Sequence, residues 1–156
     1  LLQRLPDVTL AKRAKAARNW LERQGCEEAE VEAYAREALA VIDDPRFAPV
    51  FGPRSRAEAP IVGEARGKLV SGVVDRLVVD DARVIVLDFK TDRPPPADVA
   101  DVPPSYALQL ALYREVLRKI FPAKPVTCAL LWTETPLLME LPPSQLDDVF
   151  ATFASG

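Results

Sequence analysis

The segment KLVSGVVDRLVVDDARVIVLDFK, residues 68–90, decides the fold because it predicts two neighbouring strands of one sheet. Residues 68–79 and 83–90 are rich in valine, isoleucine and leucine, which are common in strands. The polar pair at 80–81 separates the two apolar runs and favours a turn. The segment therefore predicts an antiparallel hairpin.

Two registers fit this hairpin. A two-residue turn pairs Asp75 with Val86, whereas a four-residue loop pairs Asp75 with Asp88. In either register Asp75, Asp88 and Lys90 share one face of the sheet, because side chains alternate with a period of two. The opposite face of the second strand carries side chains suited to a core, namely Ile85, Leu87 and Phe89.

The shared face gathers two carboxylates and one lysine. Converging carboxylates repel each other unless a proton, a basic side chain or a metal ion lies between them. Asp75 and Asp88 would hold a divalent ion, with Lys90 beside a phosphate; alternatively, Lys90 neutralises both aspartates in a purely structural cluster. The spacing alone leaves both interpretations open.

Composition excludes several classes of function. The chain has 156 residues, a net charge of −3 and no histidine, and 49% of its residues are hydrophobic. This length fits one domain with a real core. The negative charge argues against coating nucleic acid by charge alone, but not against a nuclease, whose acidic site attracts phosphate once metal is bound. The absence of histidine removes catalysis that depends on an imidazole base.

The cysteine pattern and the hydropathy indicate the compartment. Cys26 and Cys128 lie far apart and form no C-x-x-C pair, which excludes a cysteine zinc site or a four-cysteine iron–sulfur cluster and suggests a reducing environment. No apolar run reaches membrane-spanning length, and no signal peptide is visible.

The order of predicted elements indicates an α/β (α+β) fold in which a mixed sheet is flanked by helices. Ser144 and Asp147 resemble a capping box at the start of the last helix. The predicted elements are helices 10–24 and 27–42, a loop 46–53, strands 57–64, 68–79 and 83–90, an irregular stretch 94–104, a helix 105–120, strands 126–132 and 137–141, and a helix from about 144.

Three further residues are candidates for a site. Gln109 and Tyr113 are four residues apart on the predicted helix, so they lie on one face; the simpler interpretation is a core tyrosine with an incidental glutamine. Glu58 precedes an apolar run and is otherwise read as an exposed residue at a strand end.

Glu58, the GVVDRL segment at 72–77, the DFKT segment at 88–91 and the Q-x-x-x-Y pair at 109–113 occur in this order. The ordered set resembles the nuclease domain of the RecB family within the PD-(D/E)XK superfamily, and most closely the C-terminal nuclease domain of AddA-type helicase–nuclease subunits. The resemblance runs from residue 1 to about 141. It implies a restriction-endonuclease-like mixed sheet with an N-terminal helical pair.

The resemblance also divides the chain and implies a role for each candidate. One nuclease domain, 1–156, would comprise a helical lead-in (1–44), a nuclease core (54–141) and a C-terminal helix (142–156), and would form part of a longer helicase–nuclease. Asp75, Asp88 and the backbone carbonyl of Phe89 would bind Mg²⁺, for which Mn²⁺ or Ca²⁺ could substitute in binding. The other implied catalytic residues are Lys90, beside the attacking water or the phosphate; Gln109 and Tyr113, at the DNA-facing edge; and Glu58, at an acidic position without an assigned role.

The activity implied is that of a magnesium-dependent deoxyribonuclease, acting as an exonuclease in the repair of double-strand breaks in the bacterial cytoplasm. Its partners would be single-stranded DNA from an attached helicase and an AddB-like subunit, with no membrane. One alternative is a nuclease-like module that has lost turnover and serves as a DNA-binding or subunit-docking scaffold. Another is a free-standing repair nuclease.

One feature departs from the family pattern. The family commonly has a histidine metal ligand on its first helix, and the start of this chain, LLQRLP, resembles the stretch that follows that histidine. We therefore expect residues 1–156 alone to bind Mg²⁺ weakly and to cleave DNA slowly, and a longer chain that includes the histidine to do both better.

Overall fold

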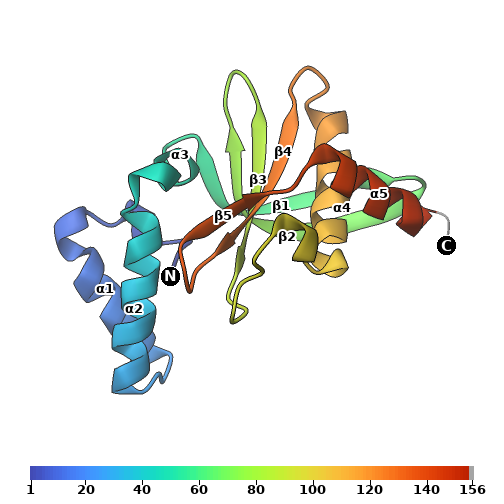
Figure 1. Ribbon diagram of the computed structural model, residues 1–156. Helices are drawn as coiled ribbons and strands as arrows, with labels where there is room; N and C mark the ends of the chain where they lie inside the picture. The colour runs from blue at the N-terminus through green and yellow to red at the C-terminus, as the bar shows by residue number, and fades with distance from the viewer. Residues whose placement is uncertain (155–156) are drawn as a thin grey trace.

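The computed structural model describes residues 1–154, in which helices cover both faces of a five-stranded sheet (Figure 1). The strands lie in sequence order, and every neighbouring pair is antiparallel except β3 and β4, which are parallel. A parallel pair needs a crossover, and α4 supplies it. The strands are β1 (Ser55–Ala65), β2 (Lys68–Val79), β3 (Val84–Lys90), β4 (Val126–Trp132) and β5 (Leu137–Glu140).

The helices form two groups. In Figure 1 the pair α1–α2 lies at the left of the sheet, and α4 and α5 pack at the right. This arrangement confirms the predicted fold class. The helices are α1 (Leu10–Arg23), α2 (Glu28–Ile42), α3 (Ala48–Phe51), α4 (Pro104–Ile120) and α5 (Pro143–Ala154), with 3₁₀ turns at Leu5–Asp7, Pro45–Phe47 and Val99–Asp101.

The predicted loop 46–53 is wrong, because most of it is helical. The carboxylate of Asp44 accepts a hydrogen bond from the backbone N–H of Arg46 (2.9 Å), and Pro45 occupies the first position of the 3₁₀ turn. An Asp-Pro pair can end one helix, and the same pair can begin the next, because the carboxylate caps the new turn and proline suits its first position. Phe47 is then buried in the core.

The predicted capping box of the last helix is also wrong. Helix α5 begins at Pro143, so Ser144 lies inside its first turn. The Asp147 carboxylate pairs instead with Arg114, a guanidinium that is only 3% exposed. A buried cation requires a partner, and this need explains the different use of Asp147. The predicted C-terminal helix also included residues 155–156, which lie outside the described residues.

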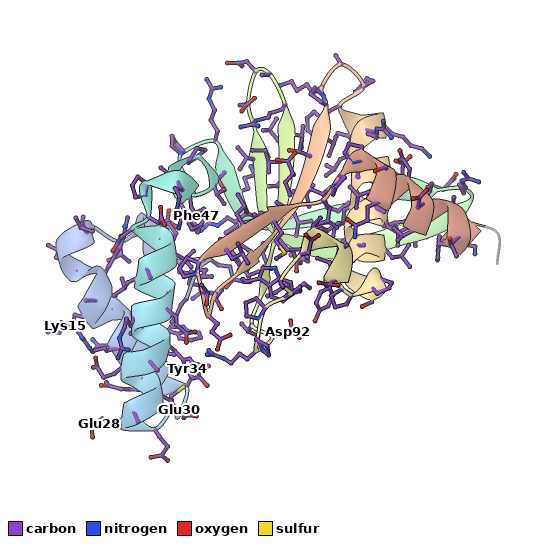
Figure 2. The ribbon with its side chains drawn as sticks, viewed as in Figure 1. Lys15, Glu28, Glu30, Tyr34, Phe47 and Asp92 are labelled. Carbon is purple, nitrogen blue, oxygen red and sulfur yellow. The ribbon has the colours of Figure 1, made fainter. Side chains whose placement is uncertain are left out.

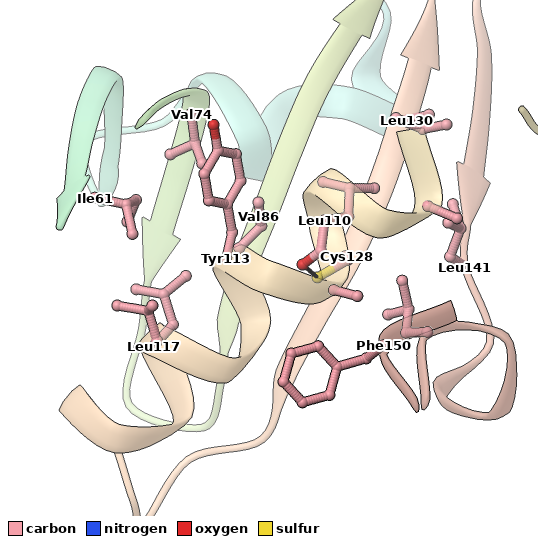
Figure 3. Packing of buried hydrophobic residues seen from close by; sticks show 14 of the residues in the cluster. Ile61, Val74, Val86, Leu110, Tyr113, Leu117, Cys128, Leu130, Leu141 and Phe150 are labelled. Carbon is pink, nitrogen blue, oxygen red and sulfur yellow. Dashed lines mark hydrogen bonds between the residues drawn. The ribbon is translucent and has the colours of Figure 1, made fainter. Parts of the chain in front are cut away.

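Apolar side chains pack against both faces of the sheet. Val86 points toward α4 and α5, and its neighbour Leu87 points toward α1, α2 and α3. The first cluster is shown in Figure 3, where the Cys128 thiol donates to the carbonyl of Leu110 (3.6 Å). Burial raises the pKa of the Cys128 thiol to about 12. This thiol is therefore a packing group.

The β2–β3 hairpin adopts the four-residue register. Val79 pairs with Val84, and the ladder continues to the pair Arg76–Leu87. The Asp80 carboxylate accepts hydrogen bonds from the backbone N–H groups of Ala82 (2.8 Å) and Arg83 (2.7 Å). An aspartate that satisfies two loop donors in this way favours the wider loop over a two-residue turn.

The alternation of side chains along β2 reverses its phase near Asp75. Val74 and Leu77 are an odd number of residues apart, yet both contact the cluster under α4. Glu58, at the facing position of β1, has a φ of +49°, a left-handed conformation that is uncommon outside glycine. The simple period-two argument therefore holds on either side of Asp75 but not through it.

Membrane insertion was not expected. None of the helices within residues 1–154 combines the length and the apolar character that are required to cross a bilayer.

The packing of Gly72 generates a prediction about stability. A Cβ added at Gly72 would lie 2.2 Å from the Tyr113 hydroxyl and 2.9 Å from its ring. We expect Gly72→Ala to lower the free energy of unfolding by about 1–3 kcal/mol, the usual cost of overpacking. Urea denaturation measures this loss.

The exposed neighbour Ser71 supplies the control, since Ser71→Ala should change stability little. Adding Tyr113→Phe to Gly72→Ala removes the closest atom and should restore part of the loss. Wild-type stability in Gly72→Ala would contradict the close packing.

Candidate active site

Asp75 lies where the β2–β3 ladder stops. The last paired residues are Arg76 and Leu87, and beyond them the Asp75 carboxylate accepts a hydrogen bond from the backbone N–H of Phe89 (2.8 Å). Its other oxygen accepts a longer bond from the side-chain amide of Gln3 (3.4 Å). A carboxylate has about four acceptor positions, so both oxygens can still bind a cation.

Asp88 and Lys90 form an ion pair beside Asp75. The Lys90 ammonium lies 2.7 Å from Asp88 Oδ2, and both side chains are largely buried, at 12% and 10% exposure. Burial raises the pKa of Asp88; Lys90 lowers it, and the nearby Asp75 raises it again. The structure thus pairs Lys90 with Asp88 and places Asp75 near enough to contribute to the raised pKa of Asp88.

An aromatic ring fixes Lys90 from the α4 side. The Lys90 ammonium lies 3.6 Å from the centre of the Tyr106 ring, a close cation–π contact. The Tyr106 hydroxyl donates a hydrogen bond to the carboxylate of Asp92 (3.0 Å). Asp92 is labelled in Figure 2. Tyr106 was not among the candidate residues in the sequence. Its position three residues before Gln109 on one helix was the available signal.

Gln109 and Tyr113 occupy a different place. The Gln109 amide donates to the Tyr113 hydroxyl (3.4 Å), and the tyrosine ring is buried against Gly72. Both residues line a surface hollow with Lys68 and Ser71. The pair shares one helix face, as predicted, but its described contacts are with β2 rather than with Asp88 or Lys90.

Glu58 lies at the level of Asp75, between the pairs Ala57–Arg76 and Ala59–Val74, where the β1–β2 register leaves both residues unpaired; its side chain is exposed. It lines a hollow with Arg4 and Trp20 on the N-terminal side of the sheet. The left-handed backbone of Glu58 is a feature of the structure, whereas the catalytic role of its side chain stays a prediction.

Arg76 holds the N-terminal segment against this site. Its buried guanidinium donates to the carbonyls of Leu2 (2.7 Å) and Gln3 (3.1 Å) and lies over the Phe51 ring, 5.1 Å from its centre. These hydrogen bonds place the side-chain amide of Gln3 beside Asp75. Neither Arg76 nor Gln3 was a candidate in the sequence. An arginine next to Asp75 on a strand is expected to point away from it, and Gln3 is held near Asp75 only through Arg76.

With this geometry established, the family can be assigned. The family profile described as the PD-(D/E)XK nuclease superfamily matches residues 1–148. The chain belongs to the PD-(D/E)XK nuclease superfamily. A comparison with curated protein sequences found no match.

One solved structure supports the fold of this PD-(D/E)XK domain. A proposed exonuclease from Eubacterium rectale superposes with a TM-score of 0.60 at 14% identity, and the alignment covers 100% of this chain and 65% of that one. The chain thus spans just under two thirds of the length of that protein. A second structure, SSO0001, gives a TM-score of 0.43 at 17% identity, covering 99% of this chain and 72% of that one, a score too low to indicate a common fold.

PD-(D/E)XK nucleases typically use divalent metal ions, and the oxygen donors at this site fit such an ion. Asp75, Asp88 and the Phe89 carbonyl are hard ligands of the kind that Mg²⁺, Mn²⁺ and Ca²⁺ prefer. Within residues 1–154 no group of three or more acidic, histidine or cysteine side chains is arranged to hold a metal ion. Two carboxylates and one carbonyl supply part of an octahedral set, and water would fill the remaining positions around a magnesium ion. Burial raises the pKa of Asp88, and a bound cation would favour its ionised form.

The environment of Asp88 generates a prediction about pH and stability. Because its folded-state pKa is raised, the folded protein binds this proton more tightly than the unfolded chain. Stability attributable to Asp88 therefore falls as pH rises from near 3.8 through the raised pKa. We expect Asp88→Asn, in EDTA, to be as stable as wild type or more stable at pH 7, with the advantage disappearing at low pH.

Urea denaturation across pH measures the difference between the two proteins. Asp148→Asn, the same change on the exposed face of α5, is the matched control. A marked loss of stability in Asp88→Asn at pH 7 would show that the Asp88–Lys90 pair is a net structural stabiliser.

Proposed function

We propose that this domain is a magnesium-dependent deoxyribonuclease, acting as an exonuclease within an AddAB/RecBCD-type helicase–nuclease that processes double-strand breaks. The observation that carries the proposal is the convergence of Asp75 and Asp88 beside Lys90 where β2 and β3 separate. Membership of a nuclease superfamily supports hydrolysis of a phosphodiester as the reaction.

The residues divide the chemical work. A divalent ion on Asp75, Asp88 and the Phe89 carbonyl would supply an activated water and polarise the phosphate. Lys90 holds a fixed positive charge beside Asp88, where negative charge grows on the phosphate in the transition state. The Tyr106 ring restricts the lysine side chain, so this charge is already in position before the substrate binds.

The partners we propose follow from the resemblance of the ordered motifs. They are single-stranded DNA delivered by a helicase in the same protein and an AddB-like subunit, in the bacterial cytoplasm. The motif set comprises Glu58, the two strand segments around Asp75 and Asp88, and the Gln109–Tyr113 pair.

The Asp88–Lys90 ion pair favours one alternative. A module that binds DNA or docks a subunit without cleaving would keep this pair as a structural element, and the contact at 2.7 Å is short enough for that role. Substitution of Lys90 distinguishes the nuclease from the non-cleaving module, because in the proposed nuclease Lys90 is needed for turnover and is not a metal ligand.

We expect Lys90→Ala to separate metal binding from catalysis. Mn²⁺ affinity should be unchanged or higher, because a neighbouring positive charge is removed, while cleavage of a single-stranded oligonucleotide should fall by roughly two orders of magnitude or more. Calorimetry measures the first quantity, and cleavage of labelled DNA in Mg²⁺ measures the second.

Two variants complete the comparison. Asp75→Ala should lose both metal binding and cleavage, and Lys15→Ala, on the exposed face of α1, should keep both. Loss of metal binding in Lys90→Ala, with both aspartates in place, would support the structural ion pair instead.

A further inference from the structure

A cavity of about 520 Å³ opens between the α1–α2 pair and the ends of β2 and β3. Asp75 and Phe89 line it at the sheet, and Trp20 and Tyr34 line it from the two helices. Its volume lies within the range of small-molecule sites, roughly 300–1,000 Å³. The cavity is therefore continuous with the proposed metal site and large enough for part of a nucleotide.

Its helical wall carries two available aromatic rings. Trp20 is 38% exposed and Tyr34 is 39% exposed, whereas their neighbour Leu21 is 4% exposed in the core between the helices and the sheet. Figure 2 shows Tyr34 on the side of α2 that faces the loop after β3. Packing of the helical pair leaves a substantial part of both rings free for contact with a ligand.

The charges around the cavity favour an uncharged ligand group. Arg93 lines it, with its guanidinium 5.9 Å from the centre of the Tyr34 ring. Both carboxylate oxygens of Glu37 accept hydrogen bonds from Arg93 (2.9 and 2.8 Å), and Glu134 accepts a longer one (3.4 Å). A cation matched by two carboxylates attracts a phosphate weakly. The same contacts hold the guanidinium of Arg93 over the tyrosine ring.

We propose that this cavity binds the base of a nucleotide next to the scissile phosphate, in contact with the rings of both Trp20 and Tyr34. The inference rests on the proposed function, because the phosphate is located by Asp75. Stacking on an aromatic ring suits any of the four bases, and the base must first leave its own stack. The site therefore selects single strands or frayed ends, not a particular sequence.

The test measures binding of a single-stranded oligonucleotide by fluorescence anisotropy with Ca²⁺ present, so that the DNA stays intact. Trp20→Ala and Tyr34→Ala should each weaken binding on the order of tenfold, the effect of losing one base–ring stack. Tyr34→Phe, which keeps the ring, should bind like wild type. Leu10→Ala, which removes an apolar side chain that is 68% exposed on α1, is the matched control.

A scan with single abasic sites tests the same idea without altering the protein. The wild type should lose affinity at one or two adjacent abasic positions, next to the cleaved bond. At those positions the Ala variants should lose nothing further. A flat scan, or equal losses from the Ala variants at every abasic position, would overturn the base site.

The two proposals fail in different ways. DNA that is cleaved normally while Trp20→Ala and Tyr34→Ala bind like wild type would refute the base site and leave the nuclease intact. DNA that is bound with the predicted abasic pattern but is never cleaved, with any divalent metal, would refute the nuclease and leave the base site intact.

Discussion

The hydrogen bond from the Phe89 N–H to the Asp75 carboxylate is the interaction on which the site depends. Backbone pairing between β2 and β3 ends at Arg76 and Leu87, and a side chain then takes the place of the next ladder partner. A buried N–H needs an acceptor, so the carboxylate satisfies the strand while staying beside Asp88. The separation of the two strands thereby creates room for an ion without leaving a donor unpaired.

The same break in β2 connects the site to the helical layer. Because the alternation reverses its phase near Asp75, Arg76 turns toward the face of the sheet that carries α3 and the N-terminal segment. There its guanidinium holds the backbone of Leu2 and Gln3, and α3 places Phe51 against both Arg76 and Phe89, with 6.2 Å between the phenylalanine ring centres. Sheet, helices and candidate site thus meet at two consecutive residues, and a change at either one affects all three.

The elements could be predicted from sequence because long apolar runs and clear turn signals determine them locally. The strand 68–79, for example, has the predicted bounds, and burial of Cys128 follows from its apolar surroundings. The register of the hairpin could not be predicted, since it depends on how Asp80 satisfies two loop N–H groups. The helical turns of 45–51 were missed because Asp-Pro ends one helix and begins another with the same chemistry.

The sequence likewise predicted those parts of the candidate site that depend on local spacing and missed those that depend on tertiary packing. Asp88 and Lys90 alternate on one strand, so local spacing was enough to bring them together. Asp75 lies beyond the last pair of the β2–β3 ladder, where the period-two argument no longer holds. Tyr106 comes from a distant helix, and its contact with Lys90 depends on how α4 crosses the sheet, which residue spacing does not determine. The left-handed backbone of Glu58 and the turning of Arg76 away from Asp75 are likewise tertiary effects.

The central claim, that a divalent ion binds where β2 and β3 separate, is tested most directly by titrating the isotope-labelled protein with Mn²⁺ and recording backbone amide NMR spectra. The account predicts paramagnetic broadening first at Asp75, Asp88 and Phe89, reversed by excess Mg²⁺, while the 80–83 loop at the far end of the hairpin stays sharp. Broadening centred elsewhere, or at the 80–83 loop first, would contradict it.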